Sequence, residues 1–211
     1  MKYVREHASG EYEEKKSRFI GEIFPVHSPE EAEEKIAAVR KRYYDARHHC
    51  YAYVLGDQYE VVKQSDDGEP SQTAGMPILN VLRGADIHDA LCVVTRYFGG
   101  TLLGTGGLVR SYTNAARAAV AGAELMTLRT GFRISTRIPY TMLGKLRYLA
   151  ESMSVREERI DYAEEVRISW LVPEEKRGAC EAAVREAGSG SIELAITEAR
   201  WYDNQVYSEE I

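Results

Sequence analysis

The sequence predicts an α+β protein of two domains. Short alternating patterns typical of strands are interleaved with amphipathic helical patterns, and the pattern changes near residues 125–131. Beyond that point the order of patterns is strand–helix–strand–strand–helix–strand, which is the order of a ferredoxin-like domain. We therefore expect one domain at residues 1–130 and a ferredoxin-like domain at residues 131–211.

The first elements of the amino-terminal domain are predicted from alternation and from capping residues. Arg18–Val26 alternates as a strand does. Ser28-Pro29-Glu30-Glu31 is typical of a helix start, with Ser as the N-cap and acids in the first turn, and this helix is expected to reach about Tyr43. His49–Leu55 and Tyr59–Ser65 are predicted to form a hairpin.

Two loops follow strands in the remainder of this domain. The first, Asp66–Gly75, is called the acidic loop, and a short helix is predicted after it at Pro77–Arg83. Ala90–Phe98 is almost entirely apolar, as expected of a strand that is buried on both faces. The second loop, Gly99–Gly107, is called the glycine-rich segment, and a long amphipathic helix is predicted from Leu108 onward.

The carboxy-terminal domain has its own alternating and helical patterns. Strands are predicted at Phe132–Ile138 and Val166–Val172, and a further strand is predicted at Ile192–Ile196. Helices are predicted at Leu143–Met153 and Ala179–Ala187. Because a ferredoxin-like fold hosts many functions, this prediction alone assigns none.

Composition indicates a cytoplasmic protein with no membrane partner. Apolar residues make up 44% and charged residues 28% of the chain, with no apolar run of membrane-spanning length and no secretory pattern at Met1–Lys16. The three cysteines are scattered, so we expect reduced thiols and no zinc framework. Neither a metal nor a cofactor is predicted.

The distribution of charge limits the function classes. Residues 1–134 carry 17 Lys and Arg against 18 Asp and Glu, a net of −1, and residues 135–211 carry 10 against 15, a net of −5. A domain that grips nucleic acid by its phosphates usually has a basic excess. A nucleic-acid site here must therefore be a local patch.

The glycine-rich segment is the most marked candidate site. It has five glycines in nine positions between a buried strand and a long helix. Glycines allow close approach of another group, and free N–H groups at a helix start attract phosphate or carboxylate. The alternative is tight strand–helix packing with no ligand. The candidate ligand-binding residues here are Arg96, Tyr97, Gly99, Gly100, Gly104, Gly106, Gly107 and Arg110.

The acidic loop supplies the other candidates. Arg96 ends an apolar strand and needs an acidic partner or a ligand, because an unpaired buried charge is costly. We therefore predict that the acidic loop and the glycine-rich segment meet in one site. The alternative is a solvated turn. The candidate ligand-binding residues from this part of the chain are Asp66, Asp67, Glu69, Ser71 and His48.

Several segments resemble those of the IMPACT/YigZ family. They are Lys16-Ser17-Arg18-Phe19, His48-His49-Cys50-Tyr51-Ala52, the stretch from Ser65 to Pro77, and, most specifically, the stretch from Val93 to Tyr112. The resemblance implies a left-handed β-α-β fold like that of ribosomal proteins for the first domain, followed by a small ferredoxin-like domain. It also implies a link to translation, because eukaryotic members regulate it.

Three functional hypotheses follow. The first is a regulatory or binding protein that acts on RNA or the ribosome through the two loops. The second is a hydrolase or transferase acting on a phosphorylated or carboxylated small molecule at the same loops, although no catalytic signature is present. The third is a protein–protein adaptor that uses the second domain as its docking surface.

Overall fold

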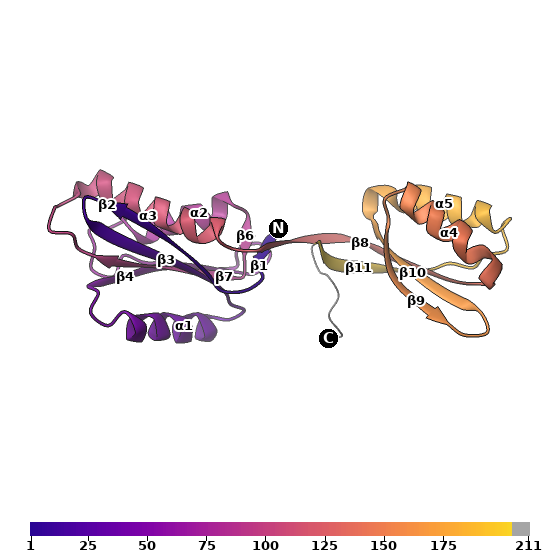
Figure 1. The fold of residues 1–211 in the computed structure, drawn as a ribbon, viewed down its shortest axis with the longest axis horizontal. Helices are drawn as coiled ribbons and strands as arrows, with labels where there is room; N and C mark the ends of the chain where they lie inside the picture. Colours follow the sequence, from indigo (N-terminus) through magenta and orange to yellow (C-terminus); the bar gives the residue numbers. More distant parts are fainter. Residues whose placement is uncertain (204–211) are drawn as a thin grey trace. The chain divides into compact units, whose positions relative to one another are not determined.

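The computed structural model describes residues 1–203, which form two sheets and five α-helices (Figure 1). The chain divides into two compact units, Met1–Thr127 and a second unit that begins at Leu128. No helix among the described residues is long and apolar enough to cross a bilayer. The elements of the first unit are β1 (Lys2–Val4), β2 (Ala8–Glu14), β3 (Ser17–Pro25), α1 (Pro29–Arg42), β4 (His48–Leu55), β5 (Val61–Ser65), α2 (Gly75–Gly84), β6 (Ile87–His88), β7 (Ala90–Tyr97) and α3 (Gly104–Ala121).

The central sheet of the first unit has the strand order β2-β3-β7-β4-β5. Strands β3 and β4 are both antiparallel to β7, so they are parallel to each other. Helix α1 joins them, and the three elements form the β-α-β unit expected from the family resemblance. This arrangement places the start of β4 beside the end of β7, with His48 opposite Arg96.

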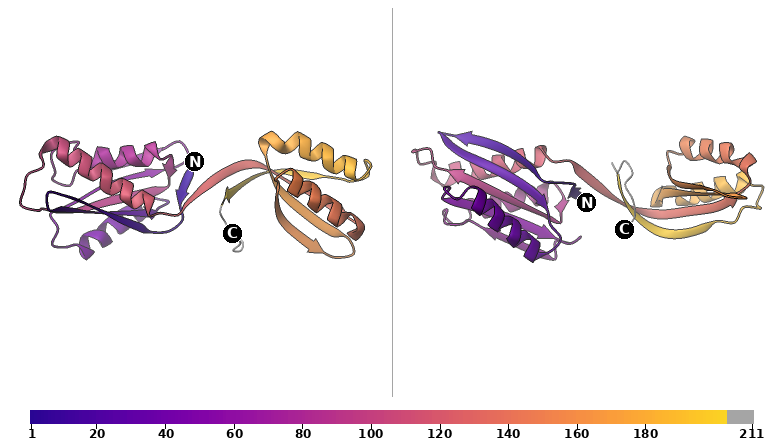
Figure 2. Two further views of the ribbon diagram at one scale, coloured as in Figure 1. Left: turned by 45° about the horizontal axis from the view of Figure 1, so that its top comes forward. Right: turned by 60° about the horizontal axis from the view of Figure 1, so that its bottom comes forward.

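Helices cover both faces of this sheet. Helix α1 lies on one side and helices α2 and α3 lie on the other (Figures 1 and 2). Strand β7 supplies side chains to both cores: Leu91 and Val93 pack on the α1 side, while Cys92 and Val94 pack on the side of α2 and α3. The prediction of a strand buried on both faces is therefore confirmed.

Capping explains where α1 begins. The Ser28 side chain accepts a hydrogen bond from the Glu31 N–H, and Pro29 is the first helical residue, as predicted. The hairpin of β4 and β5 is also present. Strand β2 was missing from the prediction because only Ala8 and Tyr12 contribute apolar side chains to the core, and Gly10 packs against the backbone of Ala118 in α3.

The second unit has the predicted ferredoxin-like order. Strand β8 lies between β11 and β10, and β9 pairs with the other edge of β10. Helices α4 and α5 pack on one face around the buried Trp170 and Leu146. Its elements are β8 (Leu125–Ile138), α4 (Tyr140–Ser152), β9 (Arg156–Tyr162), β10 (Val166–Pro173), the 3-10 turn η1 (Glu174–Lys176), α5 (Arg177–Ala187) and β11 (Ala195–Asp203).

Two predicted element boundaries are wrong. Helix α3 begins at Gly104, four residues before Leu108, because glycines carry no apolar pattern that could mark the first turn. The pattern change at residues 125–131 includes the division between the two units after Thr127, and the single strand β8 runs through it, with its first three residues paired with β1. The last strand begins at Ala195, and Ile192 is buried just before it.

Candidate functional site

The acidic loop and the glycine-rich segment meet, as predicted. Arg96 Nη1 donates a 2.6 Å hydrogen bond to Glu69 Oε1, and both side chains are buried, with 7% and 4% of their surface exposed. The same Glu69 oxygen accepts a 2.8 Å hydrogen bond from the Tyr112 hydroxyl of α3. The buried cation therefore has the acidic partner that burial requires.

Arg96 is held between aromatic rings. Its guanidinium carbon lies 5.4 Å from the Phe19 ring centroid and 5.6 Å from that of Phe98. Arg96 Nε is buried and has no hydrogen-bond partner among the described residues. The side chain is thus fixed by Glu69 and by stacking, and it retains an unused donor.

A thiol and a phenol complete this buried network. The Cys50 sulfur lies 3.0 Å from the Asp66 carbonyl oxygen and 3.3 Å from the Tyr112 hydroxyl oxygen. Burial raises the pKa of the Cys50 thiol and of the Tyr112 phenol well above their ordinary values, so both groups stay protonated. A protonated, buried thiol is a poor nucleophile.

Asp66 is used inside the fold. Its Oδ1 accepts hydrogen bonds from the N–H groups of Ala74 and Gly75 at 2.9 and 2.8 Å, and its Oδ2 accepts one from the Gln72 N–H at 2.8 Å. These donors lie at the start of α2, which has no cap from the residue directly before it. Asp66 therefore supplies the negative charge and the acceptors that a helix start favours.

Asp67 and His48 also have partners within the chain. Asp67 accepts hydrogen bonds from the His49 N–H and from Arg40, both at 2.7 Å. His48 Nδ1 lies 2.9 Å from the Asp67 carbonyl oxygen, and its Nε2 lies 4.0 Å from Glu69 Oε1. Within residues 1–203 no group of three His, Cys, Asp or Glu side chains is arranged to hold a metal ion.

The head of α3 presents free amides. The N–H groups of Gly104, Thr105 and Gly106 have no acceptor among the described residues, no side chain caps the helix, and all three residues are exposed. Gly104 and Gly100 both have positive φ angles, +71° and +85°, which glycine adopts without strain. Such exposed amides at the positive end of a helix can bind an anion.

Other residues of the predicted site serve the fold. A Cβ at Gly99 would lie 2.0 Å from the Lys16 carbonyl carbon, so Gly99 allows the turn between β2 and β3 to pack closely. Tyr97 donates to Asp45 Oδ1 at 2.7 Å, and burial together with this contact raises the pKa of Tyr97 to about 12. Ser71 is exposed. None of these three residues lines the pocket described next.

A pocket of about 450 Å³ lies at the head of α3. Of the predicted residues, it brings together Arg96, Glu69, His48 and Gly104. Much of the pocket wall could not be predicted from the sequence, because apolar residues in a loop form no periodic pattern and Arg47 lies far from the glycine-rich segment along the chain. The additional lining residues are Arg47, Pro70, Phe98, Leu102, Leu103, Thr105 and Leu108.

One unpaired cation lines this pocket, and three others lie on segments that adjoin the head of α3. Arg47 lines it, and Arg110 Nη1 lies 3.6 Å from the position that a Cβ on Gly106 would occupy. Lys16 packs against Gly99 and has Lys15 beside it. Within the described part of the chain, none of these four side chains forms an ion pair. Together with the α3 amides they form a local positive patch, which we call the α3-head patch.

Two domain models of known protein families match the chain. The Impact N-terminal domain model matches residues 15–120, and a domain of unknown function, DUF1949, matches residues 136–191. The IMPACT family member YvyE of Bacillus subtilis is 35% identical over 204 residues, covering 96% of this chain and 94% of that protein. The chain belongs to the IMPACT family.

Further relatives support the same conclusion for this IMPACT family protein. The IMPACT family member YigZ of Escherichia coli is 34% identical, with 87% of this chain and 91% of that protein covered. A crystal structure of a hypothetical protein is 32% identical and covers 92% of this chain and 95% of its own, with a TM-score of 0.57. The predicted family is thereby confirmed.

Proposed function

We propose that this IMPACT family protein is a regulatory binding protein in translation, and that its α3-head patch holds phosphate groups of RNA, free or on the ribosome. The observation that supports this most is the set of exposed N–H groups of Gly104, Thr105 and Gly106, which have no acceptor within residues 1–203. A helix start with free amides and a partial positive charge favours phosphate.

The surroundings of the pocket favour RNA over a small anion. Arg47 lines the pocket, Arg110 lies beside Gly106, and the turn that carries Lys15 and Lys16 packs against Gly99, so cations from three segments could contact more than one phosphate of a strand. Phe98 lines the pocket and is 48% exposed, and exposed rings next to a phosphate track can stack on bases. This patch is local, as the near-neutral charge of the first 134 residues requires.

Binding without catalysis fits the state of the acidic loop. The carboxylates of Asp66, Asp67 and Glu69 each accept two or three hydrogen bonds from the chain itself. A carboxylate that is committed in this way is a poor general base, because its lone pairs are already used. The occupied acids therefore support a binding role.

One substitution tests phosphate binding by the α3-head patch without weakening the fold. Thr105→Asp places a carboxylate at the second residue of α3, where it would stabilise the helix but repel phosphate. Thr141→Asp is the matched control, since Thr141 is the second residue of α4, a helix that also has no acid in its first turn. Both variants carry the same change in net charge.

The test is binding of a fluorescent single-stranded RNA of about 12 nucleotides, at about 50 and 200 mM salt, with ribosome co-sedimentation in parallel. We expect affinity that falls with salt, a loss of about tenfold in Thr105→Asp, and wild-type binding in Thr141→Asp. Equal binding by both variants, or the absence of salt-sensitive binding to RNA and to ribosomes, would contradict the proposal. Binding of inorganic phosphate or mononucleotides without RNA would favour the small-molecule alternative instead.

A further inference from the structure

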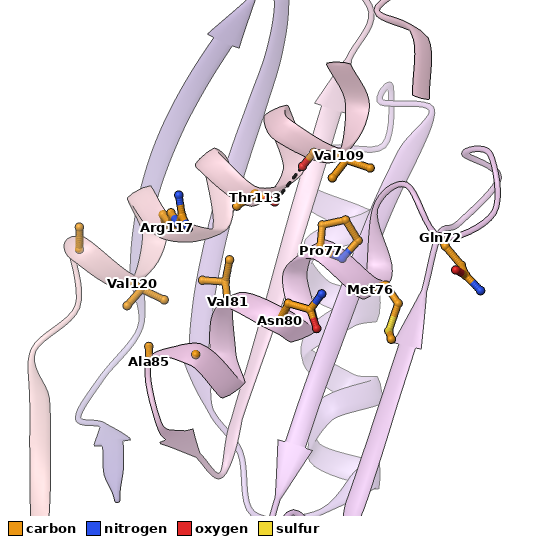
Figure 3. Close-up of a pocket in the computed structure, with 12 residues that line it drawn as sticks. Gln72, Met76, Pro77, Asn80, Val81, Ala85, Val109, Thr113, Arg117 and Val120 are labelled. Atoms are coloured by element: carbon orange, nitrogen blue, oxygen red, sulfur yellow. Dashed lines mark hydrogen bonds between the residues drawn. The ribbon is translucent and has the colours of Figure 1, made fainter. Parts of the chain in front are cut away.

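A second pocket, of about 670 Å³, lies between α2 and α3 on the outer side of the first unit (Figure 3). Helix α2 lines it with Met76, Pro77 and Val81, and helix α3 lines it with Val109 and Val120. Pro77 and Val81 are buried, whereas Met76 and Val109 are each 37% exposed, so the lining continues from the core to the surface. We call this feature the α2–α3 groove.

Four polar side chains line the groove, from Gln72, Asn80, Thr113 and Arg117. The Thr113 hydroxyl donates back to the Val109 carbonyl oxygen at 2.8 Å, so it adds no unsatisfied donor to the groove (Figure 3). Asn80 and Gln72 are exposed lining residues whose side chains form no hydrogen bond with the described chain. Arg117 also lines the groove, is exposed, and forms no ion pair with any described residue.

The charge of the two helices is unusual for this chain. Helices α2 and α3 contain Arg83, Arg110 and Arg117 and no Asp or Glu, whereas the whole protein has a net charge of −6. No acid lines the groove either. An apolar floor beside an unpaired arginine is complementary to a segment that has both apolar side chains and carboxylates.

We propose that the α2–α3 groove binds an acidic amphipathic helix of a protein partner. The apolar side chains of that helix would pack against Met76, Val81 and Val109, and a carboxylate would pair with Arg117. The ten residues of α2 are about 15 Å long, so the groove accommodates roughly three turns of a partner helix. An apolar floor with few donors suits a peptide helix better than a phosphate backbone.

Two variants test the groove without disturbing the core. Arg117→Glu reverses the charge of an exposed side chain, and Arg185→Glu on α5 is its control in the second unit. Gly84→Gln adds a side chain to the groove wall, where a Cβ meets no atom of the described chain within 4 Å. Gly144→Gln is its control, because Gly144 in α4 is also a helical glycine with open space around it.

The probe is a synthetic helical peptide of about 14 residues, four turns, with Leu along one face and Glu on its flanks. Two control peptides are compared with it, one with Lys in place of Glu and one with a scrambled sequence. We expect the acidic peptide to bind best, with affinity lowered about tenfold by Arg117→Glu and by Gly84→Gln and unchanged by the two controls. The Lys peptide should gain affinity for Arg117→Glu, which a merely unfolded variant would not show.

Amide NMR shifts locate the binding. The acidic peptide should shift the signals of Met76, Val81 and Val109, and the Thr105→Asp variant should bind it as the wild type does, which separates this proposal from the RNA proposal. Equal affinity for the acidic and Lys peptides, or shifts outside the groove, would overturn it. So would single-stranded RNA that shifts the groove signals in place of the peptide.

Discussion

The acidic loop and the head of α3 lie side by side but differ in whether their polar groups have hydrogen-bond partners within the chain. In the acidic loop, Asp66 accepts from three amides at the start of α2, and Glu69 accepts from Arg96 and Tyr112. At the head of α3, three amides have no acceptor within the described chain. Two helices on the same face of one sheet thus begin differently, the first closed by the protein and the second open.

This difference indicates which loop is structural and which is available to a ligand. A helix start needs acceptors for its first N–H groups, and they come from the chain, from water or from a ligand. Helix α2 takes them from the Asp66 carboxylate, nine residues before its first residue, Gly75, and this contact fixes the geometry of the loop between them. Helix α3 leaves them exposed beside unpaired arginines.

The largest effect should come from Glu69. Removing this carboxylate in Glu69→Ala leaves the buried Arg96 without its partner, and we expect a loss of about 3–5 kcal/mol in the free energy of unfolding. Guanidinium chloride unfolding measures this loss. The double variant Glu69→Ala/Arg96→Met should recover part of it, because the uncompensated charge is then absent. A loss below about 1 kcal/mol would mean that the acidic loop is not anchored by this pair.

Asp66 should have the next largest effect. Asp66→Ala removes the acceptors of Gln72, Ala74 and Gly75, and we expect a loss of about 2 kcal/mol in stability. Hydrogen exchange should become faster at the Ala74 and Gly75 amides. The α3 amides serve as the internal control, since their protection should not change. If hydrogen exchange at Ala74 and Gly75 were unchanged in Asp66→Ala, Asp66 would not cap α2, and the two helix starts would not differ as described.

High pH should loosen the core under the acidic loop. Burial raises the pKa of Cys50 above its ordinary value and that of Cys92 to about 12, so their neutral forms stabilise the fold fully below pH 9.0, the ordinary thiol value. As pH rises above that value, the unfolded chain loses protons first and stability falls. We expect about 1 kcal/mol per thiol between roughly pH 9 and 10.

Alanine variants assign this pH dependence. Cys50→Ala and Cys92→Ala should each remove about half of the slope of unfolding free energy against pH. Cys50 alone also contacts the acidic loop, through the Asp66 carbonyl oxygen. Only Cys50→Ala should therefore change hydrogen exchange in that loop. A slope that survives in both variants would show that other groups control the alkaline transition.

The sequence predicts those features whose cause is local. The N-cap Ser28 and the apolar run of β7 identified their elements because capping and burial act on neighbouring residues. The meeting of Arg96 and Glu69 was predicted because a buried arginine requires an acid. The start of α3 was missed since Gly104, Gly106 and Gly107 have no side chains to show a helical period.

Features created by long-range pairing could not be predicted in this way. Arg47 reaches the pocket only because β4 pairs with β7 in a register that places His48 opposite Arg96. Asp66 caps a helix that starts nine residues later, beyond the spacing of any capping motif. The α2–α3 groove depends on how two helices pack, and a single helical pattern does not contain that information.

The smallest predicted effects come from two glycines at the head of α3 and should differ in sign. Gly104 has φ +71°, so Gly104→Ala forces an L-residue into the left-handed region and should cost about 1 kcal/mol. Gly106 lies in the first turn without positive φ, and its added Cβ would make an ordinary 3.6 Å contact with Arg110 Nη1. Gly106→Ala should therefore stabilise the protein by about 0.5 kcal/mol, because alanine favours helix.

Thermal unfolding of these two variants examines the open helix start directly. If α3 begins at Gly104, the strained residue and the helical residue lie two positions apart, and only the first tolerates no side chain. If both substitutions changed the stability in the same direction, α3 would not begin at Gly104, and the free amides would belong to other residues. RNA affinity is the second measurement. Gly106→Ala places a methyl group beside the free amides, so this variant should gain stability and lose affinity for phosphate. That combination is expected of a helix start that is kept open for a ligand.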